Sequence, residues 1–94
     1  MGSNPYQRRE VYFSGHVQGV GFRYTTRQIA GGFDVTGFVR NLSDGRVYLV
    51  VEADKDEITR FLKEIHSQLG EYIRDVQVAE LAAAGEFTGF SIRH

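Results

Sequence analysis

The stretch "GHVQGVGFR", Gly15–Arg23, places three glycines, a glutamine and an arginine within nine residues. The preceding run "EVYFS" (Glu10–Ser14) is rich in β-branched and aromatic residues, which is typical of a strand. In the following run "FRYTTRQIA" (Phe22–Ala30) the apolar positions recur at helical spacing. The sequence therefore predicts a strand, a glycine-rich turn and a helix in direct succession.

A hairpin follows this first unit. The segments Val35–Asn41 and Val47–Ala53 are predicted strands, and the linker "LSDGR" between them contains the turn-forming pair Asp44-Gly45. By alternation, Val47, Leu49 and Val51 belong to one face of the second strand.

A second helix is expected directly after the hairpin. Asp54 is a suitable N-cap residue, and Glu57 three positions later completes a pattern that resembles a capping box. Gly70 supplies the stop signal. The apolar stripe of this helix is formed by Ile58, Phe61, Leu62, Ile65 and Leu69.

Two further strands are predicted, a looser one around residues 73–81 and a short last one at Gly89–Arg93. The resulting order is βαββαβ with one terminal strand. Two helices are too few to cover both faces of the sheet, so the economical packing is α+β, with a mostly antiparallel sheet and both helices on one face.

Composition limits the function classes. The chain has 94 residues, no cysteine and a formal net charge of −1, which predicts one domain without disulfides or thiolate chemistry and without a global basic field for nucleic acid. No apolar run approaches the roughly 20 residues of a membrane span. The N-terminus lacks a signal peptide, so we expect a cytoplasmic protein with no membrane association. Residues 1–7 are predicted to be a disordered lead-in, and residues 8–94 the folded domain.

The glycine-rich turn fits no established nucleotide-binding loop. A Walker loop requires Lys-Ser/Thr after its last glycine, and the third glycine of a dinucleotide fingerprint would fall on Tyr24. Glycines do permit close backbone approach, so the turn amides and the helix N-terminus could surround an anion, with Arg23 as a planar charged partner. An ordinary turn followed by a solvent-facing arginine is the alternative.

Asn41 lies at the end of the first hairpin strand. By alternation it shares a face with Val35, Gly37 and Val39, which are apolar or small. An amide at the mouth of such a row is either directed at a ligand or bonded to its own turn. The pattern of residues leaves both interpretations open.

Two stretches together, "GHVQGVGFR" and "GFVRNLSDGRV", resemble the two signatures of the acylphosphatases. The first signature is matched at Gly15, Val17, Gln18, Gly19, Val20, Phe22 and Arg23. The second is matched at Gly37, Val39, Asn41, Asp44, Gly45 and Val47. The ending "GFSIR" is similar to the usual close of the family.

The resemblance covers the chain from about residue 8 onward and implies a ferredoxin-like βαββαβ fold with a four- to five-stranded sheet. It implies a small, metal-independent enzyme without a cofactor that hydrolyses acyl phosphates to carboxylate and inorganic phosphate. Arg23 would then bind the phosphoryl oxygens, and Asn41 would hold the attacking water. The backbone amides beside Arg23 would come from Gly15, His16, Val17, Gln18, Gly19, Val20 and Gly21.

The other polar residues offer little competing chemistry. His66 is expected on the solvent side of the second helix, and His94 is the last residue, which leaves His16 as the single histidine near the proposed site. No His or carboxylate pair has the spacing of a metal site, and Arg23 supplies the positive charge without one. The predicted partners are therefore the small acyl phosphate and inorganic phosphate, and we expect a monomer.

Two alternatives stay open. The same element order builds binding modules for RNA or for small regulatory molecules, but the predicted third strand "RVYLVVEA" offers only Tyr48 for base stacking. A second alternative is the acylphosphatase-like domain that opens larger carbamoyl-transfer proteins of hydrogenase maturation. We expect no zinc-binding or transferase region, since the sequence ends at His94.

Overall fold

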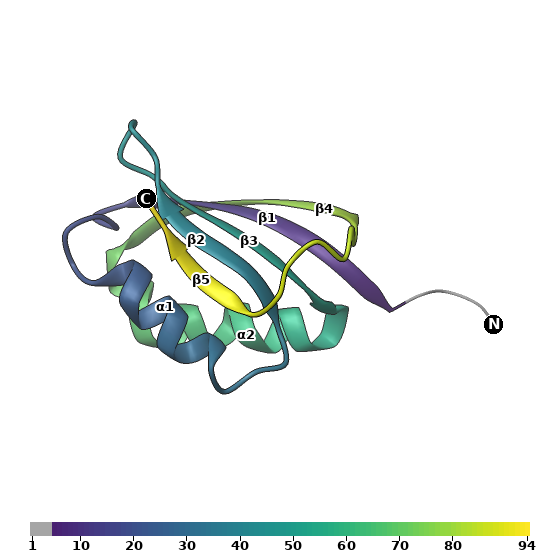
Figure 1. The fold of residues 1–94 in the computed structure, drawn as a ribbon. Helices are drawn as coiled ribbons and strands as arrows, with labels where there is room; N and C mark the ends of the chain where they lie inside the picture. The colour runs from purple at the N-terminus through teal and green to yellow at the C-terminus, as the bar shows by residue number, and fades with distance from the viewer. Residues whose placement is uncertain (1–4) are drawn as a thin grey trace.

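The structure is a computed structural model that describes residues 5–94 (Figure 1). Its elements follow the order βαββαββ, with one short 3-10 turn after the second helix. They are β1 (Tyr6–Gly15), α1 (Phe22–Ala30), β2 (Thr36–Asn41), β3 (Val47–Asp54), α2 (Lys55–Leu69), the 3-10 turn (Gly70–Tyr72), β4 (Ile73–Ala82) and β5 (Phe90–Arg93).

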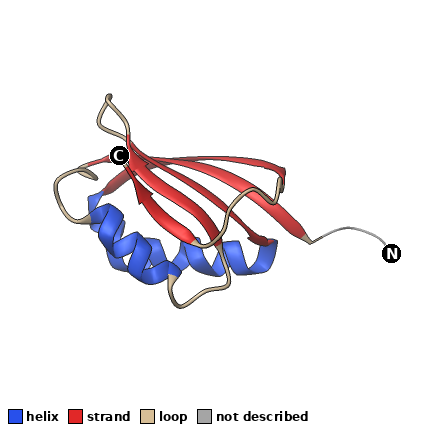
Figure 2. Cartoon of the chain, in the orientation of Figure 1, coloured by secondary structure: helices blue, strands red, loops and turns tan. Residues whose placement is uncertain are grey.

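The five strands form one sheet in the order β4-β1-β3-β2-β5. All neighbouring pairs are antiparallel except β2 and β5, which run parallel. Both helices cover the same face of the sheet, and the other face is free of helices (Figure 2). The predicted α+β ferredoxin-like class, with two helices on one face of a mostly antiparallel sheet, is confirmed.

The core lies between the sheet and the helices, where the alternating patterns predicted it. Val39 of β2 and Leu49 of β3 are register partners and are fully buried. The buried side of α2 consists of Ile58, Phe61, Ile65 and Leu69, with Leu62 packed at its margin. The buried side of α1 consists of Phe22, Thr26, Ile29 and Ala30, so the helical face deduced from the sequence is the observed one.

Strand β1 begins earlier than the predicted domain boundary. Residues 1–4 of the expected lead-in lie outside the described residues. Tyr6 and Gln7, which were also assigned to the lead-in, pair with Asp54 and Ala53 of β3. The residues before Glu10 are mostly polar, but β3 pairs with β1 from Tyr6 onward and provides backbone hydrogen-bond partners for them.

The start of α2 departs from a capping box. The Asp54 side chain accepts a hydrogen bond from the Asp56 amide at 2.9 Å, as an N-cap residue should. The Glu57 carboxylate does not return to the cap; it accepts from the Asp34 amide and pairs with Arg60. The Asp34 amide, and after it Arg60, lowers the pKa of Glu57. Glu57 thereby connects α2 to the segment that follows α1.

One buried carboxylate holds the connection between the two edge strands. The chain leaves β4 at one edge and crosses the helix-free face to reach β5 at the other edge (Figure 1). Glu52 of β3, 1% exposed, accepts hydrogen bonds from the amides of Ala84 and Gly85 at 2.8 and 2.9 Å. The Arg8 guanidinium lies 3.5 Å from the same carboxylate. Glu52 therefore fixes the connection that delivers β5 to its place.

We expect Glu52→Gln to lower the free energy of unfolding by about 2–3 kcal/mol, because one buried acceptor oxygen becomes a donor that faces a backbone amide. Urea unfolding of the variant measures this loss. Glu86→Gln is the matched control, since Glu86 also pairs with Arg8 but is exposed, and its loss should stay below about 1 kcal/mol. Equal losses in the two variants would contradict the role assigned to Glu52.

Candidate active site

The first half of the glycine-rich loop is anchored to the fold. Gly15 has φ +129°, and a Cβ atom there would lie 2.5 Å from the Tyr72 carbonyl oxygen, so the backbone of the 3-10 turn leaves no room for a side chain. Val17 is 1% exposed and belongs to the core cluster. The loop therefore leaves β1 at a fixed place and in a fixed direction.

The second half of the loop is open. Gly19 and Gly21 have φ values of +81° and +79°, and a Cβ atom at either position would meet no atom within 4 Å. Gln18 and Val20 have negative φ, since every residue of positive φ between residues 5 and 94 is glycine. Successive residues in right- and left-handed helical conformations turn their N–H groups toward one point, and the glycines at positions 19 and 21 permit the left-handed half of this pattern for binding an anion.

Helix α1 continues this arrangement. Gly21 is its N-cap residue and offers no side-chain hydrogen bond to the first turn, and no acidic residue lies in that turn. The first helical hydrogen bond of the segment runs from the Thr25 amide to the Gly21 carbonyl oxygen at 3.0 Å. The earlier N–H groups of α1 are thus available to an anion, and the helix dipole favours negative charge there.

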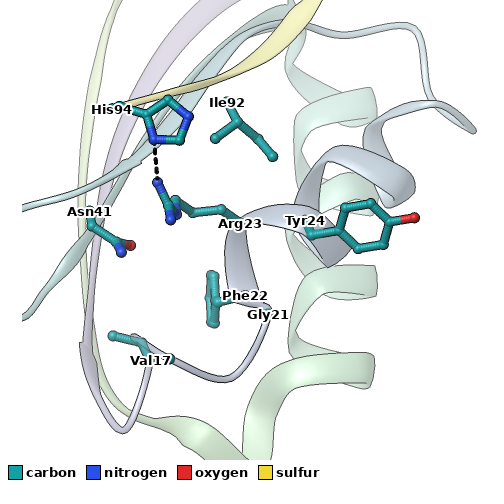
Figure 3. Close-up of a pocket in the computed structure, with 9 residues that line it drawn as sticks. Val17, Gly21, Phe22, Arg23, Tyr24, Asn41, Ile92 and His94 are labelled. Atoms are coloured by element: carbon teal, nitrogen blue, oxygen red, sulfur yellow. Dashed lines mark hydrogen bonds between the residues drawn. The ribbon is translucent and has the colours of Figure 1, made fainter.

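Arg23, in the first turn of α1, points into a cavity of about 280 Å³ (Figure 3). Its guanidinium forms no ion pair with a carboxylate of the described residues. Its Nη1 lies 3.4 Å from Nδ1 of His94. The positive charge of Arg23 is therefore not balanced by the fold, which is the condition under which an arginine binds an anion well.

Asn41 reaches the same cavity from the end of β2 (Figure 3). Its Oδ1 is buried and has no hydrogen-bond partner among residues 5–94. The adjoining turn is closed by other groups, with the Leu42 amide donating to the Arg46 carbonyl oxygen at 2.8 Å. A buried amide oxygen without a partner costs free energy unless a ligand or a water satisfies it. This geometry favours the ligand-directed interpretation of Asn41 over the turn-forming one.

Only some of the predicted site residues line the cavity. The cavity is lined by Val17, Gly19, Gly21, Phe22, Arg23, Tyr24, Asn41, Ile92 and His94. Gly15 and His16 line a separate hollow with Ser14 and Arg74. The Val20 side chain is exposed, and the Gln18 side chain is bonded to the β2–β3 hairpin.

Ile92 and His94 were missed as cavity residues in the sequence. Strand β5 pairs with β2 at the sheet edge, and this placement brings His94 to Arg23. Arg93 lies on the helix-free face, where its guanidinium is 4.0 Å from the centre of the Phe38 ring. Strand alternation separates 93 from 92 and 94, but strand order could not be deduced from "GFSIRH".

Residues 5–94 contain neither a metal-binding cluster nor a membrane-spanning helix. Between residues 5 and 94 no cluster of three His, Asp or Glu side chains is arranged to hold a metal ion. In the same part of the chain no helix has the length and apolar character needed to cross a membrane.

A protein-family model described as "Acylphosphatase" matches residues 9–92. A curated acylphosphatase of Rubrobacter xylanophilus is 42% identical over 92 residues, which is 93% of this chain and 80% of that protein. One of Oceanobacillus iheyensis is 37% identical over 87 residues, or 90% of this chain and 96% of that protein. Among solved structures, the crystal structure of acylphosphatase from Bacillus subtilis covers 94% of this chain and 99% of its own, at a TM-score of 0.86 and 28% identity.

Proposed function

Because the chain belongs to the acylphosphatase family, we propose that it hydrolyses acyl phosphates at the cavity between α1 and β2. Arg23 and the backbone amides of the loop hold the phosphoryl group, and Asn41 orients the attacking water. Within residues 5–94 the guanidinium of Arg23 has no carboxylate partner and the buried Oδ1 of Asn41 has no hydrogen-bond partner, and their presence in one cavity is the observation that carries this assignment.

The chemistry requires no strong acid from the protein. Water attacks phosphorus, the bond between phosphorus and the acyl oxygen breaks, and carboxylate and inorganic phosphate are released. A carboxylic acid has a pKa near about 4, so the leaving oxygen departs as an anion at neutral pH. The protein contributes position and charge stabilisation, which dominate catalysis of phosphoryl transfer.

The attacking water must also lose a proton during the reaction. Asn41 accepts one hydrogen bond from it through Oδ1 but is not a base at neutral pH. We propose that a phosphoryl oxygen of the substrate takes the proton, since this needs no titrating protein group. A fall of kcat through a sharp pKa that follows a protein side chain would contradict this step.

The proposal predicts hydrolysis of benzoyl phosphate by the protein in the presence of excess EDTA. Phenyl phosphate is the matched control, because its leaving phenoxide has a conjugate-acid pKa of about 10 and is a much poorer leaving group than a carboxylate. We expect the monoester to react at least about 100-fold more slowly. Release of phosphate measures both rates, and an inert benzoyl phosphate would refute the proposed function.

The aromatic rings of the helix-free face give little support to the alternative that the protein is an RNA-binding module. On the helix-free face Tyr12 and Tyr48 stack on each other, and Arg46 lies 4.6 Å from the centre of the Tyr12 ring. Arg93 lies over Phe38 in the same way. Cations of the chain thus cover rings on which bases would stack. We therefore propose that the protein acts on a small molecule and not on nucleic acid. We further propose that it is a monomer and that it works in the cytoplasm.

The alternative of a domain within a larger protein is also represented among the similar structures. A crystal structure of full-length HypF covers 100% of this chain but only 13% of its own, at a TM-score of 0.79 and 30% identity. The curated relatives reported above, at 37% and 42% identity, are named acylphosphatases. We therefore propose hydrolysis of acyl phosphates and not a maturation function.

A further inference from the structure

The side chain of Gln18 joins the glycine-rich loop to the β2–β3 hairpin. Its Nε2 donates one hydrogen bond to the Leu42 carbonyl oxygen at 2.8 Å and another to the Arg46 carbonyl oxygen at 2.9 Å. The resemblance placed Gln18 among residues whose backbone amides surround the phosphoryl group. The side chain has a separate task, because both of its N–H groups are used on the hairpin.

The two acceptors belong to a well-ordered turn. The Leu42 amide donates to the Arg46 carbonyl oxygen at 2.8 Å, and the Gly45 amide donates to the Leu42 carbonyl oxygen at 3.2 Å. The Asp44 carboxylate accepts from the Arg46 amide and pairs with its guanidinium at 2.8 Å. These contacts, the backbone amide first, lower the pKa of Asp44. The turn is therefore a defined support for the loop at neutral pH.

The positions of the bonded residues connect the two parts of the site. Gln18 directly precedes Gly19, where the open half of the loop begins, and Leu42 directly follows Asn41. We propose that Gln18 is a positioning residue that sets the distance between the phosphoryl group on the loop amides and the water on Asn41. This inference rests on the proposed function, because it concerns the alignment of its two reactants.

Glutamine suits this task for a chemical reason. Two carbonyl oxygens face one side-chain nitrogen, and a primary amide offers two N–H donors on that nitrogen. A glutamate of the same shape has no donor when ionised and would present negative charge to both carbonyl oxygens. A methionine of similar length would remove the two side-chain N–H donors and leave both oxygens only the backbone hydrogen bonds of the turn. Each substitution releases the loop from the hairpin without removing a group that contacts substrate.

The test compares Gln18→Glu and Gln18→Met with the wild-type protein in two assays. Competitive inhibition by inorganic phosphate measures the anion site alone, and single-turnover hydrolysis of benzoyl phosphate measures attack by water. We expect the rate of hydrolysis to fall about 10- to 100-fold, since misplacement by about 1 Å has effects of this size. Phosphate affinity should change less than about threefold, because Arg23 and the open half of the loop remain. Gln68→Met, on the exposed face of α2, is the control and should match the wild type.

Each result has a defined meaning. A selective loss of hydrolysis in folded variants, with urea unfolding used to confirm folding, supports the positioning role. Hydrolysis within twofold of the wild type in either variant overturns it. So does a parallel fall of phosphate affinity and rate, which would indicate a purely structural bond. Failure of the proposed function itself is distinguishable from these outcomes, because the wild-type protein would then not hydrolyse benzoyl phosphate.

Discussion

Replacing Arg23 with alanine should lower kcat/KM for benzoyl phosphate by about 10³- to 10⁵-fold, the range that arginines directed at a transferring phosphoryl group contribute elsewhere. The physical reason is that the guanidinium is the cation at the cavity and has no carboxylate partner among residues 5–94. Its charge is therefore directed at the ligand. The affinity for inorganic phosphate should fall together with the rate, because ground state and transition state both carry negative phosphoryl oxygens.

Loss of folding would not explain this effect. A cation in the first turn of a helix is opposed by the helix dipole, so its removal should leave the free energy of unfolding unchanged or raise it by up to about 1 kcal/mol. Arg23→Lys keeps a positive charge but loses the planar fork, and we expect its activity to lie between those of the wild type and the alanine variant.

Arg27→Ala is the matched control. Arg27 lies one turn later on α1, is exposed and borders a different hollow. Its removal should leave kcat/KM within about twofold of the wild-type value. An exposed charge that does not contact the substrate is screened by solvent and salt. Equal losses in the Arg23 and Arg27 variants would refute the assignment, and so would an active Arg23→Ala.

The parts of the fold that follow from local chemistry were predictable. The apolar stripe of α2 and the alternation of β3 determine which side of each element faces the hydrophobic core, and the structure has these same sides in the core. The Asp44-Gly45 pair predicted the hairpin, where Gly45 has φ +95°. Periodicity and turn chemistry act within a few residues, so they can be deduced from neighbouring letters.

The parts that depend on contacts between distant segments were not predictable. Nothing around Glu52 indicates that two amides from residues 84 and 85 bind its carboxylate, because that bond exists only once the β4–β5 connection crosses the sheet. The same holds for His94 beside Arg23 and for the two hydrogen bonds of Gln18. Sequence signatures proposed the site residues, and the strand order decided which further side chains approach them.

Asn41→Ala should have the second large effect, and a different kinetic signature. We expect kcat for benzoyl phosphate to fall about 10²- to 10³-fold, the usual loss when one group that orients or stabilises the reacting atoms is removed. KM and phosphate affinity should stay within about threefold, since Arg23 and the loop amides bind the phosphoryl group without Asn41. Steady-state kinetics with phosphate as inhibitor separates the two variants.

Asn41→Asp sharpens this prediction. The aspartate keeps an acceptor oxygen for water in the same place, but it adds negative charge to a cavity that holds an anionic substrate. KM should therefore rise in this variant, whereas in Asn41→Ala it should not. The control is Arg40→Ala, the preceding residue of β2, which is exposed and points away from the cavity. Should Asn41→Ala instead raise KM at unchanged kcat, Asn41 would be a phosphoryl ligand, and the water would have to be held by another group.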